Sequence, residues 1–415
     1  MRPYIRASRL KEKILDEFHR LILLFSKKYT LNELIDFLNT TGLVNLNWRD
    51  IVMILVGLSF IFLAINKDWE PYELLPIGLG IIAANLPFTG LINPPSANSG
   101  FQDAGLFGVM FHYGLSFWNI LPPIIFLGIG SLTDFGPVIA NPKTLILGAA
   151  AQIGIFMAFW GALFSSYIGM DFGINEAASI GIIGGADGPT TIFLSAKLAP
   201  DLLGITAVIA YSYMAAVALI QPPLMKLFTT SDERKIEMRA PREASKFEKL
   251  VFPNVALISI ILVVPKSAPL ISMFMIGNLF KESDVVPRLT KAASNEILNI
   301  ATIFLMLTVG TQLTAERVFD LQTIVILVLG LVAFSFGTIG GILFAKIMNL
   351  FVKEKINPLI GSAGVSAVPM AARISHQLGQ EANPNTFLLQ HAMGPNVAGV
   401  IGSAVIAGVF ISMVN

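Results

Sequence analysis

Residues 184–191 read GGADGPTT and interrupt one apolar run of this chain, and residues 361–369 read GSAGVSAVP and interrupt another. Glycine readily ends one helix and proline is favoured at the start of the next, so we predict a broken helix at each segment. The half-helix that begins after a break favours an anion at its N-terminus. The free carbonyl groups that end the preceding half-helix suit a small hard cation such as Na⁺.

The composition places these breaks in a membrane protein. Of 415 residues, 54% are hydrophobic and 13% are charged, and the charges are concentrated in residues 1–50 and 226–249. A net charge of +1 gives no footprint for nucleic acid. The chain has no Cys, which excludes thiolate metal sites and a cysteine nucleophile, and its four His are widely spaced. We therefore predict an all-α, polytopic membrane protein.

Several apolar runs approach the length that spans a bilayer, about 20 residues. A basic segment at residues 1–47 precedes them, and its residues 9–25 have the pattern of an amphipathic helix, either on the membrane surface or packed on the protein. Basic residues in the charged loop at residues 228–250 place that loop in the cytoplasm. The predicted spans are 51–65, 74–86, 106–118, 120–129, 144–167, 202–227, 252–264, 270–280, 297–309, 324–350 and 386–414.

An internal repeat organises these spans. Sliding the chain over itself so that Asn119 meets Asn299 also aligns several Gly, Pro and Asn residues without a gap, including Gly181 with Gly361 and Pro189 with Pro369. An odd number of predicted spans lies between the two prolines, so the halves are expected to be inverted. We expect repeat one at residues 119–227, repeat two at residues 299–415, and scaffold helices at residues 48–118 and 251–298.

The two repeats differ where chemistry would require it. In this alignment Asp187 meets Ala367, Phe193 meets Arg373 and Ala216 meets Asn396. An ionisable residue within a membrane indicates function, so Asp187 is the leading candidate for an ion site. Arg373 either holds an anion or extends to an interface. The side chains of Asn357, Ser366 and Asn396 carry uncharged oxygen atoms. Each of these residues either binds an ion or forms a hydrogen bond between helices.

Residues 133–137 (TDFGP), 140–144 (ANPKT), 184–191, 357–373 and 391–396 (HAMGPN) closely resemble the β subunit of the sodium-pumping, biotin-dependent decarboxylases. That family includes the membrane subunits of oxaloacetate, methylmalonyl-CoA and glutaconyl-CoA decarboxylases. The resemblance runs from about residue 70 to the C-terminus. It implies a prokaryotic cell (inner) membrane protein that decarboxylates carboxybiotin and exports Na⁺. Its architecture would be similar to that of elevator-type citrate/sodium symporters.

The resemblance also implies roles for residues. Asp187, Tyr213 and Arg373 correspond to catalytic positions of the family. Arg373, Gly188 and Gly361 are expected to contact carboxybiotin, and Asp187, Asn357, Ser366 and Asn396 are expected to bind Na⁺. The chain has no biotinylation segment, so biotin must be carried by another subunit. The expected partners are a biotin carrier or carboxyltransferase subunit, a small membrane subunit of the γ/δ type, and further copies of this chain.

Two functions from different classes fit the broken helices and the repeat equally well. One is the decarboxylase pump, and the other is a Na⁺-coupled carboxylate symporter that performs no chemistry. A channel is disfavoured because no segment resembles a selectivity filter. Only the family motifs favour the pump, so this choice depends on the resemblance.

Overall fold

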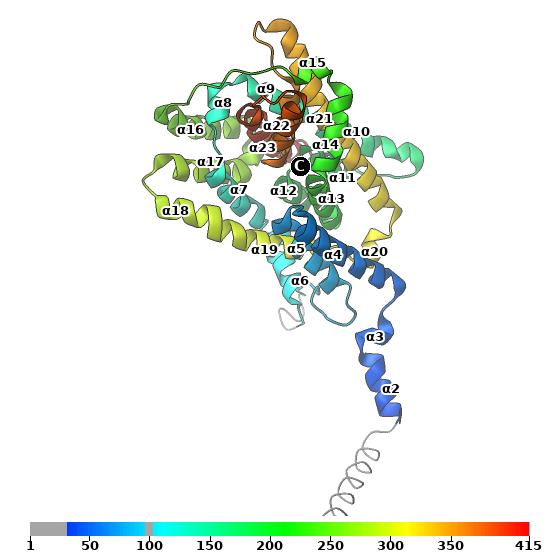
Figure 1. The fold of residues 1–415 in the computed structure, drawn as a ribbon. Coiled ribbons are helices and arrows are strands. Elements are labelled where there is room, and N and C mark those ends of the chain that lie inside the picture. Colours follow the sequence, from blue (N-terminus) through cyan, green and yellow to red (C-terminus); the bar gives the residue numbers. More distant parts are fainter. Residues whose placement is uncertain (1–30, 96–102, 415) are drawn as a thin grey trace, which may run out of the picture.

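The computed structural model describes residues 31–95 and 103–414, and all regular elements within these two ranges are helices (Figure 1). The amphipathic helix predicted at residues 9–25 lies outside the described residues. Of the predicted basic segment, the structure describes α2 (Leu31–Thr40) and α3 (Gly42–Asn45). The all-α prediction is confirmed for the described part of the chain.

Within the described residues, five helices are long and apolar enough to cross a membrane. Two bent helix pairs raise the number of candidate spans to as many as seven. One pair bends by 76° between residues 106–117 and 121–132, and the other by 64° between residues 200–215 and 217–228. These lengths and compositions confirm a multi-pass membrane protein. The five helices are Trp48–Lys67, Lys143–Tyr167, Pro287–Gly310, Leu321–Phe351 and Leu389–Val414.

After α3, the helices α4 (Trp48–Lys67) and α5 (Pro71–Ala84) form a helical hairpin. Asn47 starts α4 because its side chain accepts hydrogen bonds from the N–H groups of Arg49 and Asp50, at 2.8 and 3.1 Å. The bent pair α6 (Leu106–Phe111) with η1 (His112–Phe117) and α7 (Leu121–Leu132) follows the hairpin. The sequence predicts these spans but not the bend, because hydropathy does not report the direction of a helix axis.

The elements are described as two series, one for each predicted repeat. The first series is α7, α8 (Gly136–Ala140), α9 (Lys143–Ala151), α10 (Ile153–Phe164), η2 (Ser165–Ile168), α11 (Ile174–Gly181), η3 (Ile182–Gly185), α12 (Gly188–Leu198), η4 (Pro200–Leu202), α13 (Leu203–Ala215) and α14 (Val217–Phe228). The second series is α19 (Leu298–Gly310), α20 (Ala315–Val318), α21 (Leu321–Phe351), η7 (Pro358–Gly364), α22 (Met370–Ala382) and α23 (Leu389–Val414). In both series a break separates two short helices that lie between longer ones.

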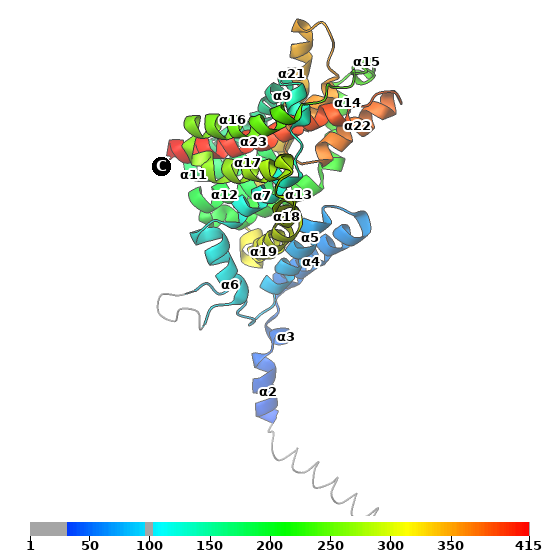
Figure 2. The ribbon, with the colours of Figure 1, turned by 90° about the vertical axis from the view of Figure 1, so that its left-hand side faces the viewer.

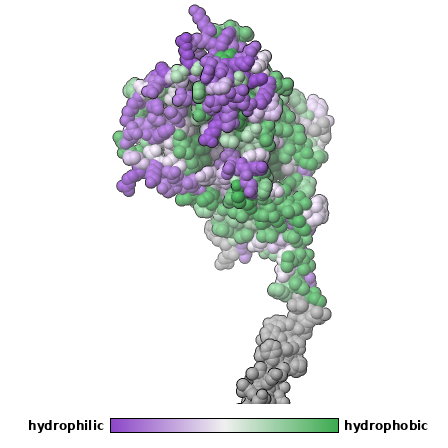
Figure 3. All heavy atoms as spheres, in the orientation of Figure 1, coloured by the Kyte–Doolittle hydropathy of each residue, from purple (hydrophilic) through white to green (hydrophobic). Residues whose placement is uncertain are grey.

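The segment between the two series begins with the charged loop. Its elements are α15 (Ser231–Arg234), α16 (Lys246–Val263), η5 (Pro265–Ser267), α17 (Ala268–Ser283), α18 (Pro287–Lys291) and η6 (Ala292–Ile297). The long axes of α16, α17 and α23 run in nearly the same direction (Figure 2). Hydrophilic residues gather on the face that carries α15 and α22, whereas apolar residues dominate around α4 (Figure 3). This distribution is that of helices that span an apolar layer and end at a charged surface.

Candidate functional site

The first break lies between η3 and α12 and carries Asp187 where α12 begins. Ala186 adopts a left-handed backbone conformation (φ 52°), which turns the chain at the end of η3. Asp187 caps α12, because its Oδ1 accepts a hydrogen bond from the N–H of Thr190 at 3.2 Å. Its Oδ2 accepts a hydrogen bond from the Ser403 hydroxyl at 2.8 Å. Asp187 is only 5% exposed, so its carboxylate lies inside the protein.

Residues 361–364 of the predicted second break form the end of η7, so the break itself runs from Val365 to Pro369, directly before α22. Ser366 connects it to the first break. Its backbone N–H and its hydroxyl both donate to the carbonyl oxygen of Gly185, at 3.0 and 2.6 Å respectively. Gly185 stands only two positions before Asp187, so the second break lies against the residues that precede the buried carboxylate.

Helix α23 contacts both breaks with side chains on one face. The Nδ2 group of Asn396 donates to the carbonyl oxygens of Ala363 and Val365, at 2.9 Å in each case. Ser403, which holds Asp187, follows seven positions later, a spacing that returns to the same side of a helix. Asn396 therefore fixes the second break and Ser403 fixes the first. The relative position of the two breaks is therefore held by α23 as well as by the direct bonds from Ser366 to Gly185.

Four buried side-chain oxygens in this region have no hydrogen-bond partner in the described part of the chain: Asn396 Oδ1, Gln152 Oε1, Thr190 Oγ1 and the Tyr211 hydroxyl oxygen. Gln152 is the single residue between α9 and α10. A Cβ added to Gly185 would lie 3.8 Å from Gln152 Oε1, so this oxygen is close to the first break. An unsatisfied buried acceptor costs about 1–3 kcal/mol. A bound cation would offset that cost.

The donor set contains one carboxylate together with hydroxyl and amide oxygens. Within residues 31–95 and 103–414, no group of three or more His, Asp or Glu side chains is placed to hold a metal ion. One negative charge among neutral oxygens matches a hard monovalent cation, since Na⁺ in transporter folds is bound by oxygen atoms at interrupted helices. The residues present therefore fit Na⁺.

Asn357, predicted to be a Na⁺ ligand, lies at the opposite end of η7 from the second break. Its Oδ1 accepts a hydrogen bond from the N–H of Leu359 at 3.1 Å. Its Nδ2 donates to the carbonyl oxygens of Arg234 and Ile236, at 2.9 Å each. At about 2 Å of rise per residue, the length of η7 separates Asn357 from the break by roughly 14 Å. In this conformation Asn357 holds the charged loop.

The two tyrosines of α13 occupy different places. Tyr213, which the resemblance favours, donates its hydroxyl hydrogen to the carbonyl oxygen of Leu327 on α21. Tyr211 lies at the first break instead, because a Cβ added to Gly188 would lie only 2.4 Å from the Tyr211 hydroxyl oxygen. That hydroxyl is buried and has no hydrogen-bond partner among the described residues. Gly188 thus allows an aromatic ring to approach the start of α12.

The predicted carboxybiotin residues Gly361 and Arg373 lie in contrasting surroundings. A Cβ added to Gly361 would lie 2.1 Å from the carbonyl oxygen of Gly341, so Gly361 allows η7 to pack closely on α21. Arg373 is exposed in the first turn of α22, and Glu70 interacts with it electrostatically. Gly361 is therefore inside the protein in this conformation, whereas the guanidinium of Arg373 is accessible.

Comparison with known proteins gives the family. A family model described as the Na⁺-transporting oxaloacetate decarboxylase beta subunit matches residues 49–414. The chain belongs to this family. The β subunit is 53% identical to the methylmalonyl-CoA decarboxylase subunit beta of Propionigenium modestum, over 92% of this chain and 99% of the relative.

Two further relatives of the β subunit carry related names. It is 53% identical to the glutaconyl-CoA decarboxylase subunit beta of Acidaminococcus fermentans, over 90% of this chain and 96% of the relative. It is 50% identical to the probable oxaloacetate decarboxylase beta chain of Vibrio cholerae, over 90% and 97%. The resemblance found in the sequence is confirmed. The protein is a multi-pass membrane subunit of a Na⁺-transporting decarboxylase, and a β subunit implies further subunits in its complex.

Three residues near the site of the β subunit escape the sequence prediction. Ser403 had a usable signal, since it is a hydroxyl seven positions after Asn396 within an apolar helix. Gln152 also stands alone among apolar residues, but nothing in the sequence predicts that its side chain lies at the first break. Tyr211 and Tyr213 are only two positions apart, and the pattern does not show which of them contacts the break.

Proposed function

We propose that this β subunit decarboxylates carboxybiotin presented by a partner subunit and uses the released free energy to export Na⁺. The observation that carries the proposal is the contact between the two breaks, where Ser366 bonds to Gly185 beside the buried carboxylate of Asp187. In the proposed site Asp187 and Asn396 bind Na⁺, and Ser366 and Ser403 hold the ligand-bearing segments together.

Asp187 exchanges Na⁺ for a proton in this proposal. A carboxylate inside a protein needs either a cation or a proton, because an unpaired buried charge is strongly unfavourable. When Na⁺ occupies the site the carboxylate is ionised, and when Na⁺ leaves it takes up a proton. The Ser403 hydroxyl, which donates to Oδ2, keeps the carboxylate oriented in both states. When Na⁺ binds again, Asp187 gives up this proton, which supplies the proton that decarboxylation consumes.

Arg373 holds the carboxylate of carboxybiotin. Its guanidinium is exposed at the start of α22, where the helix N-terminus adds partial positive charge. In the reaction the bond between the ureido nitrogen and the carboxylate carbon breaks, and its electron pair stays on the nitrogen. That nitrogen takes the proton, and CO₂ leaves. Gly188 and Gly361 contribute by letting Tyr211 and α21 pack closely at the two breaks, and any contact with carboxybiotin requires another conformation.

The gapless alignment of the two halves of the sequence, which pairs Gly181 with Gly361 and Pro189 with Pro369, supports an inverted, elevator-type arrangement. We propose that residues 119–227 and 299–415 form the two repeats and that residues 48–118 and 251–298 supply a scaffold. The charged loop at residues 228–250 faces the cytoplasm. Further copies of this chain and a small γ/δ-type membrane subunit then associate through the scaffold, and the biotin carrier approaches from the charged face (Figure 3).

One experiment separates the pump from a carboxylate symporter. Avidin purification from native membranes should recover this chain together with a biotinylated subunit. Vesicles that contain the purified complex should accumulate Na⁺ when the decarboxylation substrate is added. A chain that purifies without a biotinylated partner, and that carries Na⁺ together with a free carboxylate, would contradict the proposal.

A further inference from the structure

A cavity of about 860 Å³ opens on the charged face of the molecule, outside the site built around Asp187. Three segments form its walls: residues 236–241 of the charged loop, the end of α21 with residues 352–356, and the turn between α8 and α9. His391, at the start of α23, closes the inner end. This volume is in the range of pockets that bind small molecules. We call it the basic cavity.

Cations outnumber acids in the basic cavity. Four basic side chains line it, namely Lys143, Arg239, Lys353 and Lys355, against the two acids Glu237 and Glu354. Glu354 lies 3.3 Å from Arg239, and Glu237 accepts a hydrogen bond from the Asn383 amide at 2.8 Å. Lys143 and Lys353 have no hydrogen-bond or ion-pair partner through their side chains in the described ranges. A cleft with an excess of one charge concentrates ligands of the opposite charge, so this cavity attracts an anion.

The loop wall of the basic cavity is held at both ends. At its first end, the Asn357 amide donates hydrogen bonds to the carbonyl oxygens of Arg234 and Ile236. At its other end, Arg242 donates to the carbonyl oxygen of Ile139 at 3.3 Å and forms an ion pair of 2.7 Å with Glu248. The Arg242 guanidinium and hydrogen bonds from Ser245 lower the pKa of the Glu248 carboxyl to about 2, so this pair is ionised at neutral pH. The wall is therefore a fixed surface.

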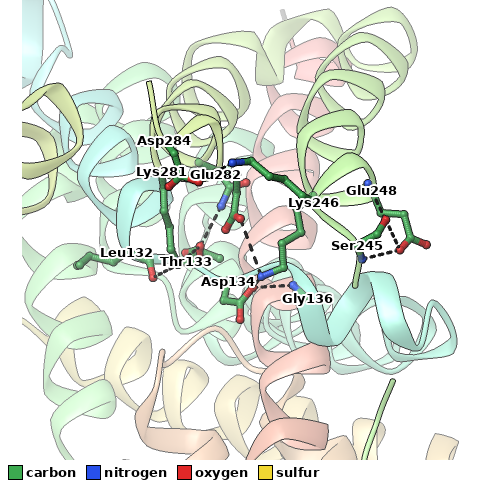
Figure 4. A network of polar contacts seen from close by, with 12 residues as sticks. Leu132, Thr133, Asp134, Gly136, Ser245, Lys246, Glu248, Lys281, Glu282 and Asp284 are labelled. Carbon is green, nitrogen blue, oxygen red and sulfur yellow. Dashed lines mark hydrogen bonds and ion pairs between the residues drawn. The ribbon is translucent and has the colours of Figure 1, made fainter. Parts of the chain in front are cut away.

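The polar network in Figure 4 holds the turn before α8, the helix that leads to the opposite wall. Asp134, in the turn between α7 and α8, accepts a hydrogen bond from the N–H of Gly136 at 2.8 Å. Lys249 on α16 lies 3.3 Å from the Asp134 carboxylate, and Lys281 donates to the carbonyl oxygen of Thr133 at 2.9 Å. These contacts join the α7–α8 turn to α16 and α17. They hold the segment that leads to Lys143.

The basic cavity and the proposed Na⁺ site lie at different depths along α23. His391 hydrogen-bonds to the backbone of Arg239. At 1.5 Å of rise per residue, Asn396 lies about 7.5 Å further along the helix and Ser403 about 18 Å. A ligand in the basic cavity therefore does not touch Asp187. It contacts the N-terminal end of the helix whose later residues hold both breaks.

We propose that the basic cavity receives the carboxylated ureido ring of biotin carried by the partner subunit, with Lys143 and Lys353 binding its carboxylate. The inference rests on the proposed function and adds a docking position that precedes Arg373. It also gives Asn357 a role as a positioning residue, because Asn357 holds the cavity wall and begins η7, which leads to the second break. No chemical step occurs in the basic cavity itself.

The first test uses the whole decarboxylase complex with the double variant Lys143→Ala/Lys353→Ala. The apparent KM for the carboxylated biotin carrier should rise roughly tenfold, because two charge-assisted contacts are lost. The kcat value and the Na⁺ concentration for half-maximal activity should stay unchanged. The matched control, Lys67→Ala/Lys291→Ala, removes two exposed lysines that do not line the cavity and should leave the KM unchanged. An unchanged KM in the cavity variant would overturn the proposal.

The second test uses the absence of native cysteine. Ala240→Cys lies in the cavity wall, and Asp232→Cys lies on α15 outside it. Carboxylated carrier should slow the reaction of Ala240→Cys with a polar maleimide several-fold and leave Asp232→Cys unaffected. Equal protection by uncarboxylated carrier would show that the protein surface, not the carboxylated ring, covers the cavity, and would also overturn the proposal. Either failure would leave Asp187-dependent Na⁺ transport intact, so the pump and the docking site are tested separately.

Discussion

The two breaks occupy matching positions when the two halves of the sequence are aligned, but different chemistry holds them in place. The first carries a charged cap, Asp187, and a left-handed residue, Ala186. The second has no charged residue and is held by neutral groups, namely Ser366 and the Asn396 amide. One carboxylate serves both breaks. A site with a single negative charge binds one monovalent cation without a large excess charge, which a symmetric pair of acids would not.

The difference also separates ligand residues from supporting residues. Asp187 and Asn396 retain oxygen atoms for a cation, since Asn396 Oδ1 has no hydrogen-bond partner within the described residues. Ser366 and Asn357 use their polar groups to join segments of the protein. Substitutions at these residues therefore test which of them bind the cation and which only support the site.

The largest effect is expected for Asp187→Asn. The amide can neither release a proton nor balance a bound cation, so Na⁺-coupled decarboxylation should fall by roughly 10²–10⁴-fold. The variant should still insert, because its amide oxygen can still accept the hydrogen bond from the Thr190 N–H that caps α12, whereas its NH₂ group cannot accept the one from Ser403. Decarboxylation and Na⁺ uptake in reconstituted vesicles measure this. An Asn variant with the native dependence on Na⁺ would remove Asp187 from the ion site.

Arg373→Ala should follow, with turnover reduced roughly 10–100-fold through loss of a charge-assisted hydrogen bond. The Na⁺ concentration for half-maximal activity should change little, because a positively charged guanidinium is not a ligand for Na⁺. Steady-state kinetics at several Na⁺ concentrations separate the two parameters. Arg373→Lys is the control that retains the positive charge without the planar guanidinium. Its turnover should lie between that of the native protein and that of Arg373→Ala. Normal turnover in the Ala variant would mean that Arg373 only extends to an interface.

Asn396→Ala and Asn357→Ala test the distinction between ligand and support directly. Asn396→Ala removes one cation oxygen and two hydrogen bonds, so the apparent affinity for Na⁺ should fall roughly tenfold. Asn357→Ala should leave the affinity for Na⁺ unchanged and lower thermal stability, because it releases the charged loop. Equal losses of Na⁺ affinity in both variants would return Asn357 to the ion site.

The smallest effect is expected for the tyrosine pair. Tyr213→Phe removes the bond to the Leu327 carbonyl oxygen and should reduce stability by about 0.5–1.5 kcal/mol. Tyr211→Phe removes a hydroxyl without a hydrogen-bond partner in the described structure, so stability should stay the same or rise slightly. Only Tyr211→Phe should alter the dependence on Na⁺, since only Tyr211 lies at the first break. Thermal melting together with Na⁺ titration distinguishes them.

Local sequence signals predict the elements of this fold better than they predict its contacts. Glycine and proline are enough to predict both breaks, because they act within one turn of the chain. Apolar length predicts a multi-pass protein but gives too many spans: eleven are predicted, whereas five helices of the described residues, or up to seven with the bent pairs, are long and apolar enough. The approach of Gln152 to the first break and the crossing that brings Ser403 to Asp187 depend on packing between distant segments, which composition does not encode. Asn357 shows the same limit: its amide is polar and near the second break in sequence, yet its partners are the carbonyls of Arg234 and Ile236.

Cysteine labelling of the two breaks tests the central claim most directly. Ala186 and Ala367 are 1% and 2% exposed, and the chain contains no native cysteine. If the breaks form one site with alternating access, Ala186→Cys and Ala367→Cys should react with an impermeant thiol reagent from one side of the membrane at a time. Na⁺ should change which side reacts, because a ligand shifts the population toward the conformation it binds. The exposed control Leu43→Cys should be indifferent to Na⁺. Labelling of both breaks that is equal from the two sides and unaffected by Na⁺ would contradict the account.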